Sequence, residues 1–281
     1  MEITVSKQNN HEYEVLFDDL IREVFGFSFH TWLEHQLWDE RYESYSIIND
    51  GVMLANLCVF KTEMMVLEKR FLAIQFGTVC TRKNEQGNGL SRILMEHVLS
   101  LYADTPAFLF ANDSVIDFYP RFGFRQEQTY KPTINIRISN HFEPVKLSVD
   151  DNIFKDALKN RVGHSTVFDC LNTDSIQMFH FLMEYQEDIY LLPECDAIIV
   201  ANQTDARLFI ADVISRKPVT FEQIKAELPF NGIETIEFGF CPDWLDVQPS
   251  WEPVSMNDVM FFIKGEWNLP DAFRFPTTSI T

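Results

Sequence analysis

Two glycines stand between an apolar run and a helical pattern. Residues 71–80 are mostly apolar, the loop Gln86-Gly87-Asn88-Gly89-Leu90-Ser91 follows, and a helical period of apolar residues begins at Leu90. The first turn of a helix carries unpaired N–H groups and a positive dipole end, and glycine lets the backbone approach an anion closely. The pattern therefore predicts a phosphate cradle, flanked by Arg82, Lys83 and Arg92. A loop that simply turns tightly is the alternative.

A second stretch contains residues that could take part in a reaction. Residues 106–112 form a short apolar run of strand length that ends at Asn112. Residues 113–124 have a helical apolar face, and Gly123 suits the left-handed position after a helix. Pro120 removes one helical hydrogen bond, so we expect this helix to be short or kinked. Tyr119 lies within it.

Together these two motifs resemble the GNAT superfamily of acyl-CoA-dependent N-acetyltransferases. The loop at residues 86–91 matches the family's pyrophosphate motif, Gln/Arg-x-x-Gly-x-Gly/Ala, except for Ser91 at the last position. Asn112, Tyr119 and the Gly-Phe pair at residues 123–124 match a second signature. The resemblance covers about residues 1–140 and is closest to the multi-domain branch that contains the enhanced-intracellular-survival type of enzyme.

The resemblance implies transfer of an acetyl group from acetyl-CoA to a primary amine by direct attack, through a tetrahedral intermediate. The backbone of residues 77–79 would bind the carbonyl oxygen. A phenol with a reference pKa of about 10 can protonate a departing thiolate, which makes Tyr119 the candidate general acid; packing beside Phe118 is its structural alternative. The residues expected to bind the cofactor are Val79, Thr81, Gln86, Gly87, Asn88, Gly89, Leu90, Ser91 and Asn112.

The general base stays unassigned at this stage. Gln75 stands where some relatives have Glu, and the alternatives are a water chain or one of several carboxylates. These are Glu12, Glu40, Glu63 and the carboxylate of Thr281 if the tail folds back. A covalent route through Cys80 is disfavoured because residues 78, 79 and 81 provide no activating His.

Composition favours a globular protein of the cytoplasm. The 281 residues suit two domains, and 46% of them are hydrophobic. We expect neither a membrane span nor a secretory signal, because long apolar segments are missing from the sequence. The five cysteines are odd in number and lack paired spacing, so we expect reduced thiols and no metal site.

The net charge of −19 makes nucleic acid an improbable partner. Residues 1–140 carry 19 acidic and 13 basic residues, whereas residues 141–281 carry 23 and 10. An acidic field would concentrate a cationic small-molecule or peptide amine, although solubility alone also explains it. The sequence does not indicate the oligomeric state.

The expected fold class is α/β (α+β), with a GNAT-type mixed sheet in residues 1–140 and a second domain in residues 141–281. In the first half we expect a strand at residues 3–6, helices at 12–25 and 30–38, and a hairpin turning at 49–51. The aromatic residues Phe29, Trp32 and Trp38 could line an acceptor pocket, but core packing is the more frequent use.

In the second half we expect helices at residues 151–160 and 174–185, a hairpin at 197–214, a helix from Thr220 to residue 228, and strands at 233–240 and 259–264 that finish its sheet. This order repeats the first half without a cradle, since residues 215–221 contain no glycine and include a proline. We therefore expect a degenerate second copy that binds no cofactor, with an unrelated α+β domain as the alternative.

Two functions of other kinds stay open. The first domain could bind acyl-CoA as a sensor or interaction module without turnover. The cradle could also hold another nucleotide, which competition with ATP and NAD would reveal.

Overall fold

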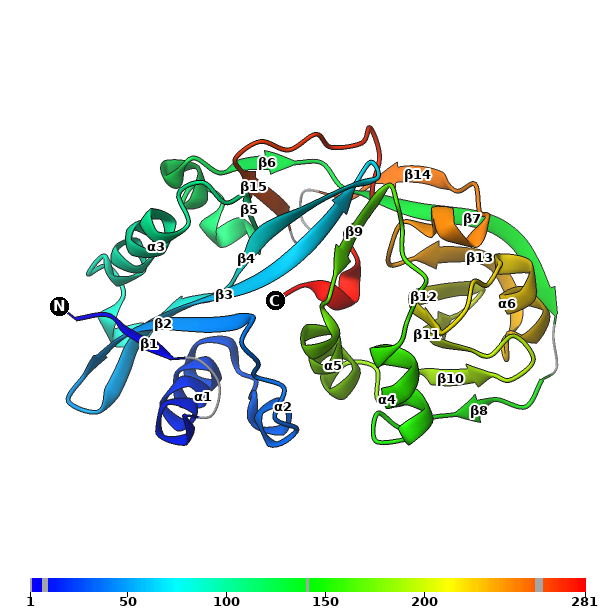
Figure 1. Ribbon diagram of the computed structural model, residues 1–281, viewed down its shortest axis with the longest axis horizontal. Coiled ribbons are helices and arrows are strands. Elements are labelled where there is room, and N and C mark those ends of the chain that lie inside the picture. The colour runs from blue at the N-terminus through cyan, green and yellow to red at the C-terminus, as the bar shows by residue number, and fades with distance from the viewer. Residues whose placement is uncertain (1, 7–9, 140–141, 256–259) are drawn as a thin grey trace.

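The computed structural model describes residues 2–6, 10–139, 142–255 and 260–281. Two mixed β-sheets lie side by side, each flanked by helices, and the C-terminus lies between them (Figure 1). The expected α/β class is confirmed.

The first sheet contains eight strands. Its order is β1 (Thr4–Ser6), β2 (Tyr42–Asn49), β3 (Val52–Val66), β4 (Lys69–Thr81), β5 (Ala107–Ala111), β15 (Met260–Lys264) and β6 (Arg125–Glu127), with β9 (Phe168–Leu171) beside β3. The β2–β3 hairpin turns at Asp50 and Gly51, which both have positive φ angles, as the Asn-Asp-Gly run predicts. The β3–β4 hairpin is long and reaches toward the second half of the chain (Figure 1).

Helices cover both faces of this sheet. On one face lie α1 (His11–Phe25) and α2 (His30–Glu34), whose side chains form a core with Cys58 and Phe60 of β3. The Trp32 and Trp38 rings are buried in this core, so they pack rather than line a pocket. On the other face lies α3 (Leu90–Leu101), which packs against alternate residues of β3.

The apolar period that begins at Leu90 predicts an inward face of Leu90, Ile93, Leu94, Val98 and Leu101, and the structure differs from it at three positions. Leu90, Leu94 and Val98 are buried as expected, but Met95 is also buried, while Ile93 and Leu101 are exposed. The buried stripe is narrower because the helix crosses one sheet face only, and residues at its edges remain in contact with solvent.

The second sheet contains seven strands. Its order is β14 (Ser250–Pro253), β7 (Tyr130–Ser139), β13 (Asn231–Phe238), β12 (Arg207–Ser215), β11 (Ala197–Thr204), β10 (Ile189–Leu192) and β8 (Val145–Lys146). Helices α4 (Asn152–Lys159) and α5 (Asp174–Met183) pack on one face, and α6 (Phe221–Glu227) packs on the other. The hairpin and the helices therefore occur where the sequence predicts them.

The start of α6 supports the expectation that this half lacks a cradle. Thr220 and Gln223 form a capping box, in which the Thr220 hydroxyl accepts from the Gln223 N–H and the Gln223 side chain accepts from the Thr220 N–H. Two of the main-chain donors at this helix start are thus engaged within the chain. The missing cofactor site itself stays a prediction.

The sheets exchange strands along the chain, which corrects one prediction. The strand near residues 259–264 was expected to finish the second sheet; β15 instead lies between β5 and β6 of the first. It fits there because both its faces are apolar: Phe262 packs toward Tyr119, while Phe261 and Ile263 enter the core between the halves. Conversely, β7 belongs to the second sheet. The division of the chain near residue 140 stays a prediction.

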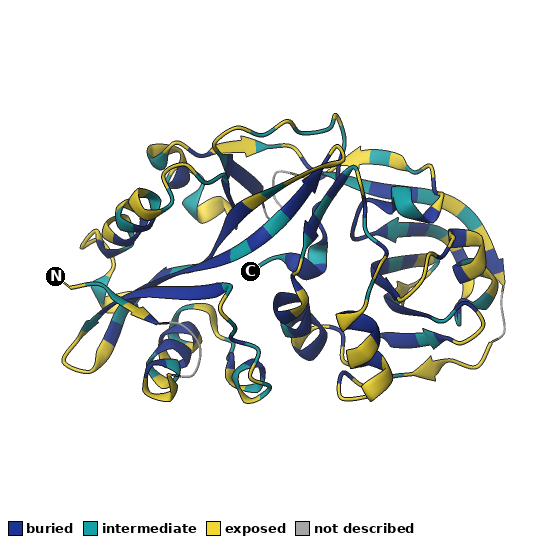
Figure 2. Cartoon of the chain, viewed as in Figure 1, coloured by how far each residue is buried: buried dark blue, intermediate teal, exposed yellow. Residues whose placement is uncertain are grey.

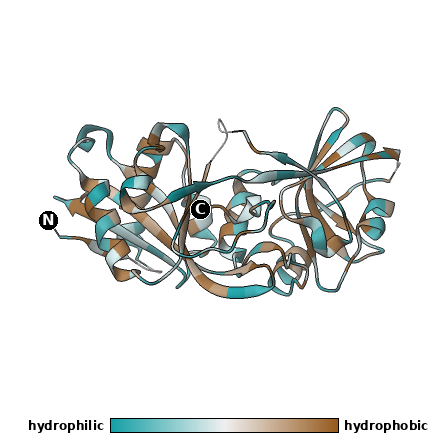
Figure 3. Cartoon of the chain, turned by 90° about the horizontal axis from the view of Figure 1, so that it is seen from above, coloured by the Kyte–Doolittle hydropathy of each residue, from teal (hydrophilic) through white to brown (hydrophobic). Residues whose placement is uncertain are grey.

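A shared core fills the contact between the halves. It contains Phe108 and Phe261 from the first sheet and the stacked pair Phe168 and Phe273, whose ring centroids are 4.3 Å apart. Strands are buried through the middle of the molecule, and exposed residues collect on the outer helix faces (Figure 2). Seen from above, the apolar segments run through both halves (Figure 3).

Membrane-spanning helices, metal-binding clusters and cysteines are features on which the sequence gives expectations. Within the described ranges, no helix is both long and apolar enough to cross a membrane. The same residues contain no cluster of His, Cys, Asp or Glu side chains placed to hold a metal ion. All five cysteines are buried and free.

Candidate active site

A cleft opens where β4 and β5 separate. The two parallel strands pair at Ile74–Ala107, Gln75–Phe108 and Phe76–Leu109, and beyond this point they diverge. The cleft has a volume of about 790 Å³ and is lined by both strand ends, the loop before α3 and the turn that contains Tyr119. The two sequence motifs therefore meet at one site.

The wall formed by β4 is bulged at Thr78. Cys58 of β3 pairs with Gly77 and Asn56 pairs with Cys80, so β4 carries an additional residue, and Thr78 has a φ of 44°. A bulge interrupts the ladder and turns main-chain groups away from the neighbouring strand. Gly77, Thr78 and Val79 all line the cleft.

A buried polar chain holds this bulge. The Tyr13 hydroxyl is 2.7 Å from the Ser44 hydroxyl, which donates to Asn56 Oδ1. Asn56 Nδ2 then donates to the Thr78 carbonyl and hydroxyl oxygens, both at 3.2 Å. Ser44 and Asn56 are fully buried, so the low dielectric strengthens these bonds and fixes the course of β4 beside the cleft.

The glycine loop has the backbone that the cradle requires. Gly87 and Gly89 have φ angles of 84° and 77°, both line the cleft, and each has open space where a Cβ would be. Gly89 is the N-cap of α3, with no side chain capping the helix start. The first-turn N–H groups of α3 therefore have neither a helical acceptor nor a capping side chain, at a helix start whose N-cap residue lines the cleft.

Side chains of the loop have different positions. Gln86 and Ser91 line the cleft, and the Ser91 hydroxyl is 2.7 Å from that of Thr81, which also lines it. Asn88 and Leu90 are not among the lining residues. The Asn88 amide donates to Glu85, and the Leu90 side chain is buried in the core at the start of α3, so only their main chains could face a ligand.

The flanking positive charge differs from the prediction. Arg82 is bound by Asp19 and Glu23 of α1, and the Lys83 N–H donates to Glu23, so this pair holds the loop against α1. Arg92 lines the cleft as expected, and so does Arg121. Sequence reasoning missed Arg121; its place two residues after Tyr119 was the available signal.

Tyr119 lies in a short 3₁₀ turn, Tyr119–Phe122, rather than in an α-helix. Pro120 is the second residue of this turn and Gly123 ends it in the left-handed conformation, so the expected short helix is confirmed. The ring packs against Phe118, Phe124 and Phe262, and it also lines the cleft. Burial, with a smaller effect of Cys80, raises the Tyr119 pKa to about 12, so the phenol stays protonated at neutral pH.

Asn112 and Val79 also line the cleft. The Asn112 side chain accepts from the Ser114 N–H at 3.1 Å and thereby caps the turn that begins at Asp113. Its roles of shaping this turn and facing a ligand are compatible, because the capping bond uses only Oδ1.

Cys80 lies in the cleft wall but lacks the environment of a nucleophile. Burial raises the pKa of its thiol, and the nearby Cys58 raises it further. A protonated thiol is a weak nucleophile. The environment of Cys80 thus also disfavours a mechanism through a covalent acyl-enzyme.

Thr281 is the one candidate base that lines the cleft among those considered from sequence. Glu12 and Glu40 are exposed elsewhere, and Glu63 lies in a different cavity, 3.8 Å from Arg70. Thr281 packs against Gly77, where an added Cβ would lie 2.8 Å from the Thr281 Cβ.

Gln75 holds the last residues in this position. With its amide oriented for hydrogen bonding, Gln75 donates to the Ser279 carbonyl at 3.1 Å and accepts from the Thr281 N–H at 2.8 Å. Gln75 is fully buried, so these bonds are shielded from water. The sequence marked Gln75 only as a departure from a Glu in some relatives.

Comparisons with known proteins identify a domain in the first half of the chain. A sequence model of the acetyltransferase (GNAT) domain matches residues 5–126. No curated protein sequence matches the chain.

Several solved structures are similar in fold. A probable N-acyltransferase from Enterococcus faecalis is 15% identical, with a TM-score of 0.59 over 92% of this chain and 72% of that one. A GCN5-related N-acetyltransferase from Kribbella flavida is 14% identical, with a TM-score of 0.53, 92% of this chain and 70% of that one covered. Eis1 from Mycobacterium abscessus is 13% identical, with a TM-score of 0.53 and coverages of 92% and 74%. Identities this low show the shared fold only.

Proposed function

We propose that this protein, an acyltransferase that carries a GNAT acetyltransferase domain in its first half, moves an acetyl group from acetyl-CoA to a primary amine. The GNAT family uses acetyl-CoA as co-substrate. The observation that carries the proposal is the cleft between β4 and β5, which joins a glycine cradle, a bulged strand and the buried phenol of Tyr119.

The cradle fits a diphosphate. Gly87 and Gly89 leave open space on the cleft side, and the N–H groups at the start of α3 can donate to phosphate oxygens while the helix dipole favours the negative charge. Arg92 and Arg121 add positive charge at the same cleft. We assign cofactor binding to Val79, Thr81, Gln86, Gly87, Gly89, Ser91 and Asn112, and to the main chain of Asn88 and Leu90.

The bulged strand supplies donors for the carbonyl oxygen. Attack by the amine places negative charge on this oxygen, and preorganised main-chain N–H groups stabilise such charge strongly. Residues 77–79 present their main chain there, and the Asn56 bonds to Thr78 keep it from relaxing.

Tyr119 donates the proton that the departing thiolate takes up. Its raised pKa keeps the phenol protonated, and its ring is fixed by three aromatic neighbours. A fixed donor reduces the entropy that proton transfer must lose.

The amine must lose a proton to react, and Thr281 supports an assignment for the base. When Thr281 is the last residue of the chain, its main-chain carboxylate stands beside Gly77 at the cleft. Gln75 binds the N–H and the hydroxyl of this residue, which leaves the carboxylate available to accept a proton.

The acceptor is an amine of a small molecule or peptide, and the acidic balance of the chain favours a cationic one. The test is release of free coenzyme A thiol from acetyl-CoA over a panel of polyamines, aminoglycosides and lysine peptides, with product masses measured. Calorimetric titration with acetyl-CoA accompanies it. Binding without release on any amine would replace the proposal by a sensor function, and absence of binding would remove both.

A further inference from the structure

The last five residues are held one by one. The Thr277 N–H donates to the Gly239 carbonyl at 2.8 Å, at the end of β13. Thr278 accepts from Gln177, the Ser279 hydroxyl is 2.8 Å from that of Thr173, and the Ile280 carbonyl is 2.7 Å from His180 Nε2. Gln75 holds Thr281, as described above. We call residues 277–281 the tail.

Three of these contacts come from one side of α5 and its N-cap residue, Thr173. Thr173, Gln177 and His180 are spaced by four and three residues, so their side chains project from the same side of the helix. Gln177 contacts Thr278, Thr173 contacts Ser279 and His180 contacts Ile280. Three consecutive residues of the tail therefore each have a hydrogen-bond partner on this side of α5.

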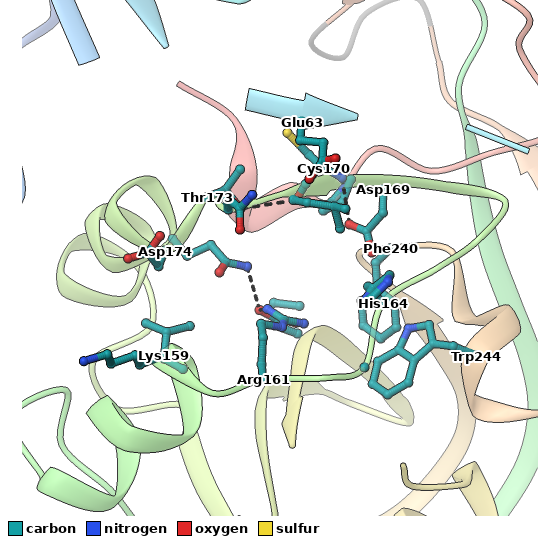
Figure 4. A pocket seen from close by; sticks show the side chains of 18 of the residues that line it. Glu63, Lys159, Arg161, His164, Asp169, Cys170, Thr173, Asp174, Phe240 and Trp244 are labelled. Carbon is teal, nitrogen blue, oxygen red and sulfur yellow. Dashed lines mark hydrogen bonds and ion pairs between the residues drawn. The ribbon is translucent and has the colours of Figure 1, made fainter. Parts of the chain in front are cut away.

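Gln177 is itself oriented from behind. Its Nε2 donates to Asp212 Oδ2 at 3.0 Å, and Arg161 donates to both oxygens of Asp212 at 2.9 Å. Arg161, Gln177 and Asp212 all line one cavity, in which Figure 4 labels Arg161 and Thr173. The guanidinium fork thus fixes the carboxylate, and the carboxylate fixes the amide that holds Thr278.

His180 lies between two acceptors. Its Nε2 faces the Ile280 carbonyl, and its Nδ1 is 3.2 Å from a carboxylate oxygen of Glu184. Because a carbonyl oxygen can only accept, Nε2 donates to Ile280 in this contact. Replacing the ring by a methyl group would leave the partly buried Ile280 carbonyl without its donor.

The network is polar where apolar packing would suffice to anchor a chain end. Thr173, Gln177, His180, Thr278 and Ser279 are all buried. Buried hydrogen bonds impose one geometry, whereas apolar side chains can slide against each other. This difference matters at Thr281, which shares the cleft with Tyr119 and the cradle.

We propose that α5 is a positioning element of the acyl-transfer centre. Thr173, Gln177 and His180 fix the tail so that Thr281 stays in the cleft, and the second half of the chain is thereby a working part of catalysis in the first. This inference rests on the proposed function in assuming that Thr281 acts at the reacting amine.

The test compares variants on α5 of the full-length protein. Loss of a buried hydrogen bond of this kind corresponds to about a 10- to 100-fold change, and we expect His180→Ala to lower kcat by that factor. The dissociation constant of acetyl-CoA should stay within about twofold, because the cradle does not touch α5. His180→Gln, whose amide can donate to the Ile280 carbonyl, should recover most of kcat. Met183→Ala, an exposed position on α5, is the matched control.

Hydrogen exchange of the peptide containing the tail gives a readout independent of activity. His180→Ala should exchange faster there than the wild type and than Met183→Ala, while α1 and α3 keep their protection. Unchanged tail exchange, or a fall in acetyl-CoA affinity that parallels kcat, would overturn the positioning role. If the wild type transfers to no amine while His180→Ala still speeds exchange of the tail, only the proposed function is overturned.

Discussion

Gly77 and Thr281 share one volume at the cleft. A Cβ built on Gly77 would lie 2.8 Å from the Thr281 Cβ, closer than side-chain atoms approach each other. The φ angle of Gly77 is not in the left-handed region, so its backbone would accept a side chain. Glycine is needed here for the approach of Thr281 rather than for a turn.

This contact gives the first prediction. Gly77→Ala should displace Thr281 while leaving the β4 main chain in place, and a misplacement of about 1 Å can lower kcat by about 100-fold. Acetyl-CoA affinity, measured by calorimetric titration, should change little. The double variant Gly77→Ala/Thr281→Gly removes the opposing side chain and should recover activity. A double variant as slow as the single one would show that the methyl group acts on something other than the tail.

The second prediction concerns the cradle. Gly89→Ala forces a side chain into a φ of 77° and should lower the free energy of unfolding by about 1–2 kcal/mol. Gly232→Ala in β13 is the matched control, because its φ is 71° and it too has open space around it. Both variants should lose similar stability in urea titrations. Gly89→Ala alone should weaken acetyl-CoA binding, by about tenfold for one lost bond to a phosphate oxygen. Equal affinities in the two variants would place the diphosphate elsewhere.

The third prediction tests the base. One glycine appended after Thr281 moves the carboxylate by one residue and replaces it with a peptide group, so the rate of transfer should fall by about 100-fold or more. Tail exchange should remain slow, since Gln75, Thr173 and His180 keep their partners. Intact mass confirms the chain end in both proteins. Full activity of the extended chain would show that the Thr281 carboxylate is not the general base, and a water molecule or the acceptor itself would then take the proton.

Local signals predicted much of the architecture. The hairpin at Asp50 and Gly51, the capped start of α6 at Thr220, and the left-handed glycines at 87 and 89 depend on residues within a few positions of one another. Turn chemistry and helix periodicity act over such distances, so the sequence carries them directly.

Contacts between distant segments could not be predicted in this way. An apolar run such as β15 reads as a strand, yet the run does not say whether it joins β5 or a strand of the second half. The same holds for α5 and the tail, where His180 and Ile280 are 100 residues apart. The motif loops were therefore recognisable from the sequence. The position of Thr281 in the cleft and the ion-pair partners of Arg82 became visible only in the folded structure.

The fourth prediction concerns Tyr119. Tyr119→Phe removes the proton donor but keeps the ring among Phe118, Phe124 and Phe262, so kcat should fall by about 100-fold while acetyl-CoA affinity stays nearly unchanged. Tyr190→Phe, a phenol of β10 outside the cleft, is the control.

The pH profile of the wild type tests the same role, because the raised pKa of Tyr119 predicts how kcat changes at high pH. A general acid acts in its protonated form, which persists below its pKa, and burial raises the Tyr119 pKa to about 12. A phenol at its ordinary value of about 10 would lose half its activity at that pH. The wild type should instead keep its kcat up to about pH 11, where the proton begins to leave a group with the higher pKa. An alkaline fall centred near pH 10 in the wild type, missing in Tyr119→Phe, would show an exposed phenol in solution. If Tyr119→Phe has the same kcat as the wild type and shows no alkaline fall, Tyr119 does not donate the proton.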